Sequence, residues 1–151
     1  GATLKHRTHR LGGETYEAWC CSTHIYNKDS CSMKFIRDDD IKLAFVTMMN
    51  KLVFGHKLIL KPYLLTLRSS STDSSDEYRA EIDTLSSLVT GDGAKLKETE
   101  RLIKLVERGR MFTEFDADLF SKLVKHICAF SRNEIGFALK CGLTPRERIG
   151  E

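Results

Sequence analysis

The chain has 151 residues, of which 41% are hydrophobic and 30% charged, and its net charge of +3 is too small to indicate nucleic acid by itself. No apolar run approaches the roughly 18 to 20 residues of a membrane span, and residues 1–10 contain no apolar signal-peptide core. Five cysteines, an odd number, argue against a complete disulfide framework and leave metal binding or buried thiols as alternatives.

The first segment, residues 3–37, is expected to form short strands. Gly12-Gly13 separates two β-tolerant stretches, 3–10 and 15–21, which predicts a hairpin. Large apolar side chains are few in this segment, so it can hardly form a core of its own. Small β units of this kind usually need a staple such as a metal.

A helix is expected to follow Asp38-Asp39-Asp40, because acidic residues favour a helix N-terminus. An apolar stripe at helical spacing continues to Leu52, and Gly55 is expected to end the helix. Pro62 is expected to start or kink a second helix. The serine-rich residues 69–76 are expected to form a linker.

Two charged helical patterns follow, over 77–89 and 94–110, with Gly91-Asp92-Gly93 expected to interrupt or turn the helix between them. Their narrow apolar stripes predict a coiled-coil arm at about 76–110. A short helix is expected after the cap-rich residues 113–116. Alternating apolar residues then predict a terminal β-hairpin at about 126–140.

The charge is uneven along the chain. Residues 41–70 contain five basic residues and no acid, and residues 1–10 contain Lys5, Arg7 and Arg10 and no acid. Basic segments favour approach to a polyanion, because neutralised phosphates release condensed counterions. An ordinary solvated face is the alternative for either segment.

The sequence offers one cluster of metal-ligand residue types: Cys20, Cys21, His24 and Cys31. Thiolates and imidazoles on short loops bind structural zinc, but no CxxC occurs in the chain, so buried or loose thiols are the alternative. Cys20 and Cys21 are expected to point to opposite faces of a strand. Cys128 and Cys141 are expected to be apolar packing residues. Signatures of catalysis such as a P-loop, GxSxG or HExxH are absent.

The order of these features resembles the C-terminal zinc β-ribbon and coiled-coil region of large serine recombinases. The resemblance begins with Trp19-Cys20-Cys21-Ser22, then Cys31, then Phe35-Ile36-Arg37-Asp38 opening a helix. It continues through several short downstream motifs, which are Asn50-Lys51-Leu52, Leu60-Lys61-Pro62, Glu114-Phe115-Asp116, Leu119-Phe120, Ile135-Gly136-Phe137 and Lys140-Cys141-Gly142-Leu143. The family's CxxC-Gly ligand pair has no counterpart in this chain.

The resemblance implies an α+β, mainly helical chain. It would comprise a truncated zinc β-ribbon at 1–37 and a helical region at 38–151 that carries the coiled-coil arm and the C-terminal β-hairpin. Cys21 and Cys31 would be two zinc ligands of the intact domain, so the metal site would be absent or incomplete in this fragment. The candidate DNA contacts are Lys5, Arg7, Arg10, Lys28, Lys34 and Arg37.

The function implied by the resemblance is that of a DNA-binding, non-catalytic fragment of a serine site-specific recombinase. It would recognise double-stranded attachment-site DNA, and its arm would contact other recombinase subunits or a directionality factor to control synapsis. The expected location is the cytoplasm of a bacterium, with the gene on a phage or mobile element and no membrane contact. The alternative is a cytosolic coiled-coil adaptor that binds only protein partners.

Overall fold

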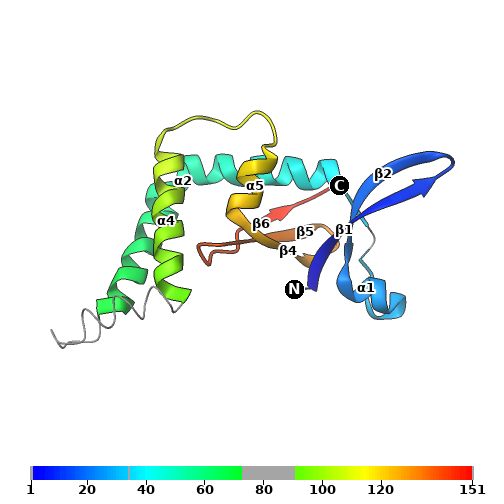
Figure 1. The fold of residues 1–151 in the computed structure, drawn as a ribbon, viewed down its shortest axis with the longest axis horizontal. Helices are drawn as coiled ribbons and strands as arrows, with labels where there is room; N and C mark the ends of the chain where they lie inside the picture. The colour runs from blue at the N-terminus through cyan, green and yellow to red at the C-terminus, as the bar shows by residue number, and fades with distance from the viewer. Residues whose placement is uncertain (1, 34, 73–90, 151) are drawn as a thin grey trace. The chain divides into compact units, whose positions relative to one another are not determined.

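The computed structural model describes residues 2–33, 35–72 and 91–150 of the chain (Figure 1). These residues form an α+β fold of helices and a six-stranded antiparallel sheet. The chain divides into two compact units, which are interleaved in sequence. The first comprises Gly1–Met48, Thr113–Leu139 and Leu143–Glu151, and the second comprises Met49–Phe112 and Lys140–Gly142.

The whole sheet belongs to the first unit, and its strand order is β3-β2-β1-β4-β5-β6. The strands are β1 (Ala2–Leu11), β2 (Glu14–Cys21), β3 (Ile36–Arg37), β4 (Val124–Ser131), β5 (Glu134–Leu139) and β6 (Arg146–Arg148).

The hairpin expected around Gly12-Gly13 is confirmed by the pairing of β1 with β2. Both turn glycines have positive φ angles, of 61° and 90°. Two-residue hairpin turns that need positive φ at both positions favour glycine there, because it carries no Cβ.

The two strands expected near the C-terminus are present and pair with each other across a short turn, and they also join a larger sheet. β4 pairs with β5, and it also pairs with β1, where Ala2 lies opposite Ala129. β5 has a further neighbour in β6. The N-terminal ribbon and the C-terminal strands therefore share one sheet.

The core of the first unit contains a cluster of phenylalanines. The Phe45 ring lies edge-on to the rings of Phe115, Phe120 and Phe137, with centroid distances of 5.7, 5.1 and 5.8 Å. Phe45 and Phe137 are fully buried. Edge-to-face aromatic pairs are favourable beyond the area they bury, so this cluster joins the first turns of α2 to β5.

Helix α2 spans Asp38–Thr72, so the expected end at Gly55 and the expected linker from residue 69 are wrong for the described residues. Pro62 lies inside the helix. Leu52 and Leu60 are buried on either side of Gly55. Tertiary packing of such residues overrides the helix-propensity cost of about 1 kcal/mol for Gly and about 3 kcal/mol for Pro.

By length and composition alone, α2 would pass for a membrane-crossing helix, as core helices of water-soluble proteins also do. One face of α2 is buried within the protein, and its buried residues include Ile41, Phe45, Met48, Met49, Leu52 and Leu60.

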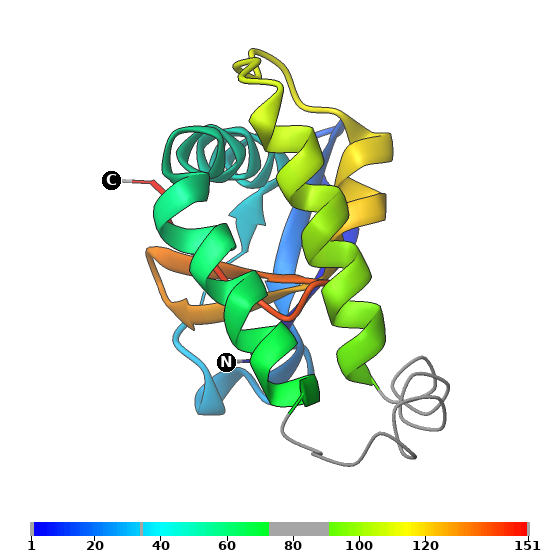
Figure 2. The same ribbon diagram turned by 90° about the vertical axis from the view of Figure 1, so that its left-hand side faces the viewer.

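The second unit pairs the later part of α2 with α4 (Gly91–Glu107), and the two helices run side by side in both views (Figure 2). Arg68 Nη2 lies 2.8 Å from Glu100 Oε1, and Lys61 Nζ lies 3.1 Å from Glu107 Oε1. Asn50 donates to the Phe112 carbonyl and accepts from the Phe112 N–H.

The predicted coiled-coil arm is only partly covered, because residues 76–90 lie outside the described residues. Within α4 the apolar stripe, formed by Leu102, Ile103 and Val106, is buried in the second unit. Residues 91–93 form the start of α4, and residues 73–90 before them lie outside the described residues, so the expected interruption of the helix stays a prediction. This part of the stripe packs within the chain instead of being exposed for another subunit.

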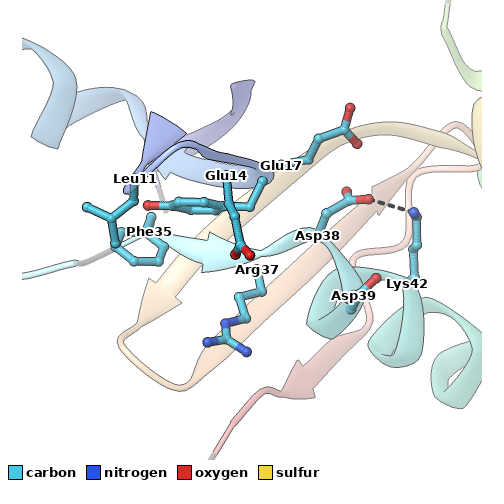
Figure 3. A pocket seen from close by; sticks show the side chains of 9 residues that line it. Leu11, Glu14, Glu17, Phe35, Arg37, Asp38, Asp39 and Lys42 are labelled. Carbon is cyan, nitrogen blue, oxygen red and sulfur yellow. Dashed lines mark ion pairs between the residues drawn. The ribbon is translucent and has the colours of Figure 1, made fainter. Parts of the chain in front are cut away.

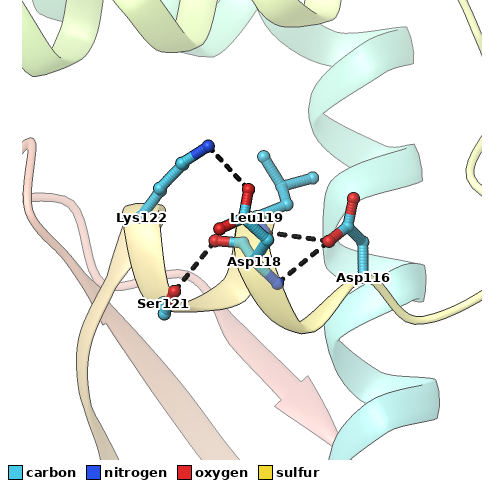
Figure 4. A network of polar contacts seen from close by, with 5 residues as sticks. All are labelled: Asp116, Asp118, Leu119, Ser121 and Lys122. Atoms are coloured by element: carbon cyan, nitrogen blue, oxygen red, sulfur yellow. Dashed lines mark hydrogen bonds and ion pairs between the residues drawn. The ribbon is translucent and has the colours of Figure 1, made fainter.

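Helix α5 spans Ala117–Leu123 and begins at the cap predicted from the sequence. The Asp116 carboxylate accepts hydrogen bonds from the backbone N–H groups of Asp118 and Leu119, both at 3.0 Å (Figure 4). Lys122 pairs with Asp118 one turn earlier, at 2.6 Å. An N-cap of this kind satisfies N–H groups that have no partner within the helix.

Candidate functional site

The predicted zinc ligands Cys21 and Cys31 are brought together by a short connection after β2. Cys21 is the N-cap residue of α1 (Ser22–Tyr26), and Cys31 directly follows the 3-10 helix η1 (Lys28–Ser30). Both cysteines line one pocket, and the Cys31 side chain is one of the groups that lower the pKa of the Cys21 thiol. Cys21 is buried and Cys31 is partly exposed.

The surroundings of Cys21 favour its thiolate. Burial raises the pKa of the Cys21 thiol, but hydrogen bonds from the backbone of His24 and Thr23 and from the Cys31 and Thr23 side chains outweigh burial and lower it. A thiolate is the form of cysteine that binds metals. The Cys21 thiol therefore loses its proton more readily than an ordinary cysteine thiol.

The connection between the two cysteines is held by local hydrogen bonds. His24 Nδ1 lies 2.8 Å from the Cys31 carbonyl oxygen, so this imidazole bonds the loop at one ring nitrogen. The Asn27 side chain accepts from the Asp29 N–H at 3.0 Å and caps η1. These bonds fix the backbone on which both sulfurs lie.

The residues present fit part of a structural zinc site. Cys21 and Cys31 supply two sulfurs, whereas such a site needs a tetrahedral set of ligands. Among the described residues, no group of three or more possible ligands includes either cysteine. A cavity of about 330 Å³ lies beside the pair and is bordered by Ala2, Ser32 and Phe130.

Cys20 is separated from this pair, as expected for adjacent residues in a strand. Its sulfur lies 3.5 Å from His9 Nε2. Burial raises the pKa of the Cys20 thiol, although Arg7 opposes this shift. Cys20 is therefore held as a neutral thiol near His9. The expected packing cysteines, Cys128 and Cys141, are buried.

The strand register places three of the predicted DNA contacts on one face of the sheet. Arg7 lies opposite Ala18 in β2, and Ala18 lies opposite Arg37 in β3. Lys5 lies opposite Cys20, two residues from Ala18, so it shares this face. All three basic side chains are exposed, and we call Lys5, Arg7 and Arg37 the ribbon basic face.

The other predicted DNA contacts are placed differently. Side chains alternate between the two faces of a strand, and Arg10 is an odd number of residues from Lys5 and Arg7 in β1. Its side chain is therefore on the opposite face. Lys28 is exposed in η1, between the two metal-ligand candidates. Lys34 lies outside the described residues.

Sequence reasoning missed a polar network on the opposite face of the ribbon. His6 Nε2 lies 3.4 Å from Glu17 Oε2 and 3.7 Å from Asp38 Oδ1. Trp19 Nε1 donates to Asp38 Oδ1 at 2.7 Å, and Lys42 Nζ lies 2.7 Å from Asp38 Oδ2. No local motif marks this group, because its members come from β1, β2 and α2 and meet only once the hairpin register is known.

Asp38 is held as a carboxylate within this network. Burial raises the pKa of its carboxyl group, but the bonds from Lys42 and Trp19 and the charges of Lys42 and His6 lower it overall. His6, Glu17 and Asp38 place their ligand atoms within 4.8 Å of one another. Because Asp38 already has Lys42 and Trp19 as partners, the group is best described as an ion-pair network.

A pocket of about 540 Å³ adjoins the network (Figure 3). Its wall includes the acidic side chains Glu14, Glu17, Asp38 and Asp39 and the basic side chains Arg37 and Lys42. Carboxylates outnumber cations in this wall. The pocket therefore disfavours a phosphate, although Arg37 belongs both to its wall and to the ribbon basic face.

Comparison with known families relates the first third of the chain to recombinases. Residues 1–50 match the model of the recombinase zinc beta ribbon domain, which is 50 of 151 residues. The matched region includes β1, β2, β3 and both Cys21 and Cys31. The comparisons with curated proteins and with solved structures gave no match. The family match supports DNA binding and zinc binding as properties of the recombinase-related part of the chain.

Proposed function

We propose that the chain is the DNA-binding and subunit-interaction fragment of a serine site-specific recombinase. The observation that carries this proposal is the alignment of Arg7 and Arg37 on either side of Ala18, with Lys5 on the same face. The match of residues 1–50 to the recombinase zinc beta ribbon domain supports it. The chain's own role is non-catalytic, and the catalytic serine belongs to another domain of the full-length protein.

The ribbon basic face would lie against the phosphate backbone of double-stranded DNA. Guanidinium groups bind phosphate through paired N–H donors, and each neutralised phosphate releases condensed counterions. The carboxylates of Glu17 and Asp38 take part in the network with His6, on the opposite side of β1 and β2, so they do not oppose this approach. Glu14 is the one acidic side chain of β2 that shares the face of Arg7 and Arg37, so basic side chains remain in excess on this face.

Zinc would be held by Cys21 and Cys31 together with two ligands from outside the described residues. Bound to the thiolates, it would supply a structural cross-link for a ribbon segment that has few large apolar side chains. The hydrogen bonds to Cys21 already favour the form that a metal binds. Metal loading would therefore stabilise the loop that joins β2 to β3.

The finer parts of the proposal concern the partners. The DNA would be attachment-site DNA in the cytoplasm of a bacterium. Control of synapsis would depend on the arm predicted at about 76–110, through other recombinase subunits or a directionality factor. Within this arm the contact would fall on residues 76–90, because the apolar stripe of α4 is buried within the chain. Deletion of residues 76–90 should therefore reduce synapsis of two attachment sites by the full-length recombinase while leaving DNA binding by a single chain unchanged.

A pair of arginine substitutions tests the proposed DNA face. Fluorescence anisotropy of a labelled, mixed-sequence DNA duplex would be measured with the wild-type chain and with the R7Q and R10Q variants. R7Q should weaken binding about threefold to tenfold, because it removes one phosphate contact. R10Q is the matched control, since it removes the same charge from the same strand on the other face.

The adaptor alternative predicts a different result. A chain that binds only protein should show no DNA affinity, and joint substitution of Lys5, Arg7 and Arg10 by alanine should then change nothing. Equal losses for R7Q and R10Q would instead contradict the assignment of the DNA contact to the ribbon basic face.

A further inference from the structure

A stacked pair of side chains lies on the sheet far from the matched region in sequence. The guanidinium carbon of Arg146, in β6, lies 3.9 Å from the centroid of the Phe130 ring. A Cβ atom on Gly136, in β5, would lie 2.5 Å from a carbon of the same ring. The absence of a side chain at Gly136 therefore allows the Phe130 ring to rest directly on the sheet, with Arg146 above it.

The strand register places this stack on the face that carries Lys5 and Arg7. A row of opposed residues runs from Thr3 in β1 through Cys128 and Gly136 to Arg146. Thr3 has the same parity as Lys5 and Arg7, and residues opposite one another in a sheet share a face. Arg146 and the ribbon basic face are thus on the same side of one continuous sheet.

The charge around the stack is also positive. Arg148 lies opposite Glu134 and has the same parity as Arg146, and Arg132 is exposed in the turn between β4 and β5. Glu134 Oε1 lies 4.0 Å from Arg146 Nη1. This single carboxylate offsets only one of the three arginines named here. A polyanion on the ribbon basic face would meet this second basic group on the same side.

We infer that Arg146, held by Phe130 over Gly136, is a second contact to the DNA phosphate backbone, outside the residues that match the zinc ribbon. Stacking on an aromatic ring orients a guanidinium group while its N–H edge stays free for a phosphate. Strands in a sheet are about 4.8 Å apart, so β6 lies roughly 14 Å from β1, a distance that one duplex spans. This inference rests on the proposed DNA-binding function and extends its interface to the C-terminal strands.

The test compares five chains on the same mixed-sequence duplex by anisotropy over a series of salt concentrations. They are the wild type, R146Q, F130L and the double variant, with R101Q as a control on α4, where Arg101 pairs with Glu98. R146Q should weaken binding several-fold and make the salt dependence less steep by about one unit. F130L keeps the charge and should lose part of the affinity, and R101Q should match the wild type.

The double variant should bind no more weakly than R146Q, because Phe130 acts through Arg146 and coupled residues are not additive. Circular dichroism would verify that each variant is folded. Wild-type binding with R146Q unchanged in affinity and salt dependence would overturn this inference and leave the proposed function intact. Absence of DNA binding by the wild type would overturn both.

Discussion

Trp19 Nε1 donates a 2.7 Å hydrogen bond to Oδ1 of Asp38 and so joins β2 to the first residue of α2. The same carboxylate contacts Lys42 one helical turn later, and His6 packs against the Trp19 ring with a centroid distance of 5.0 Å. Asp38 therefore connects the recombinase-like ribbon to the helix that carries the core phenylalanine Phe45.

Replacement of Asp38 by asparagine should lower the free energy of unfolding by about 1 kcal/mol at neutral pH. Asparagine keeps an oxygen that can accept from Trp19, but it loses the charge that faces Lys42 and His6. Since folding lowers the pKa of Asp38, its stabilisation is complete above the unfolded carboxyl pKa of about 3.9 and is lost as the pH falls through the folded value. The difference in free energy of unfolding between the wild type and D38N should therefore disappear below about pH 4.

The adjacent Asp39 supplies the control for this measurement. Its side chain is exposed, so D39N should change stability by no more than about 0.5 kcal/mol. Urea unfolding at several pH values measures both variants. The role given to Asp38 would be contradicted if D39N lost as much free energy of unfolding as D38N. It would also be contradicted if the difference between D38N and the wild type stayed constant in acid.

Phe45→Ala should destabilise the protein by about 3 to 5 kcal/mol, because it removes the ring at the centre of the phenylalanine cluster and leaves a cavity. Leu43→Ala, two residues earlier in α2, should cost no more than about 0.5 kcal/mol, because Leu43 is 67% exposed. Denaturant unfolding of both variants gives the comparison. If both variants lost a similar free energy of unfolding, the assignment of the buried face of α2 to the side that carries Phe45 would be wrong.

Cobalt(II) provides a spectroscopic test of the Cys21 and Cys31 pair, because thiolate ligation produces charge-transfer absorption in the near ultraviolet. Titration of the chain should produce this absorption, and it should strengthen as the pH rises, since metal must displace thiol protons. C21S and C31S should each reduce it. C20A is the matched control and should retain it, because Cys20 lies near His9. If C20A lost the absorption while C21S and C31S kept it, the assignment of the metal to Cys21 and Cys31 would be wrong.

Local patterns predicted the elements that local chemistry determines. Glycine at two successive positive-φ positions gave the Gly12-Gly13 hairpin, and the Asp116 carboxylate gave the start of α5. The extent of α2 could not be predicted in this way. Gly55 and Pro62 disfavour a helix locally, and only the burial of residues such as Leu60 shows why the helix continues.

The candidate site shows the same division. The resemblance to the recombinase zinc ribbon singled out Cys21 and Cys31 as a pair, and in the structure both residues line one pocket. Neither the opposite placement of Arg10 nor the joining of β1 to β4 could be foreseen, because both depend on register between strands. Arg146 lies more than a hundred residues from Arg7 in sequence, and only the shared sheet relates them.

The salt dependence of DNA binding by the wild-type chain tests the central claim most directly. If Lys5, Arg7 and Arg37 contact phosphates, the logarithm of the association constant should fall linearly with the logarithm of the salt concentration, with a slope of about −3 or steeper. Anisotropy of a labelled mixed-sequence duplex between low and physiological salt would give this slope. Binding that is absent at low salt, or that does not change with salt, would contradict the assignment of this chain as a DNA-binding recombinase fragment.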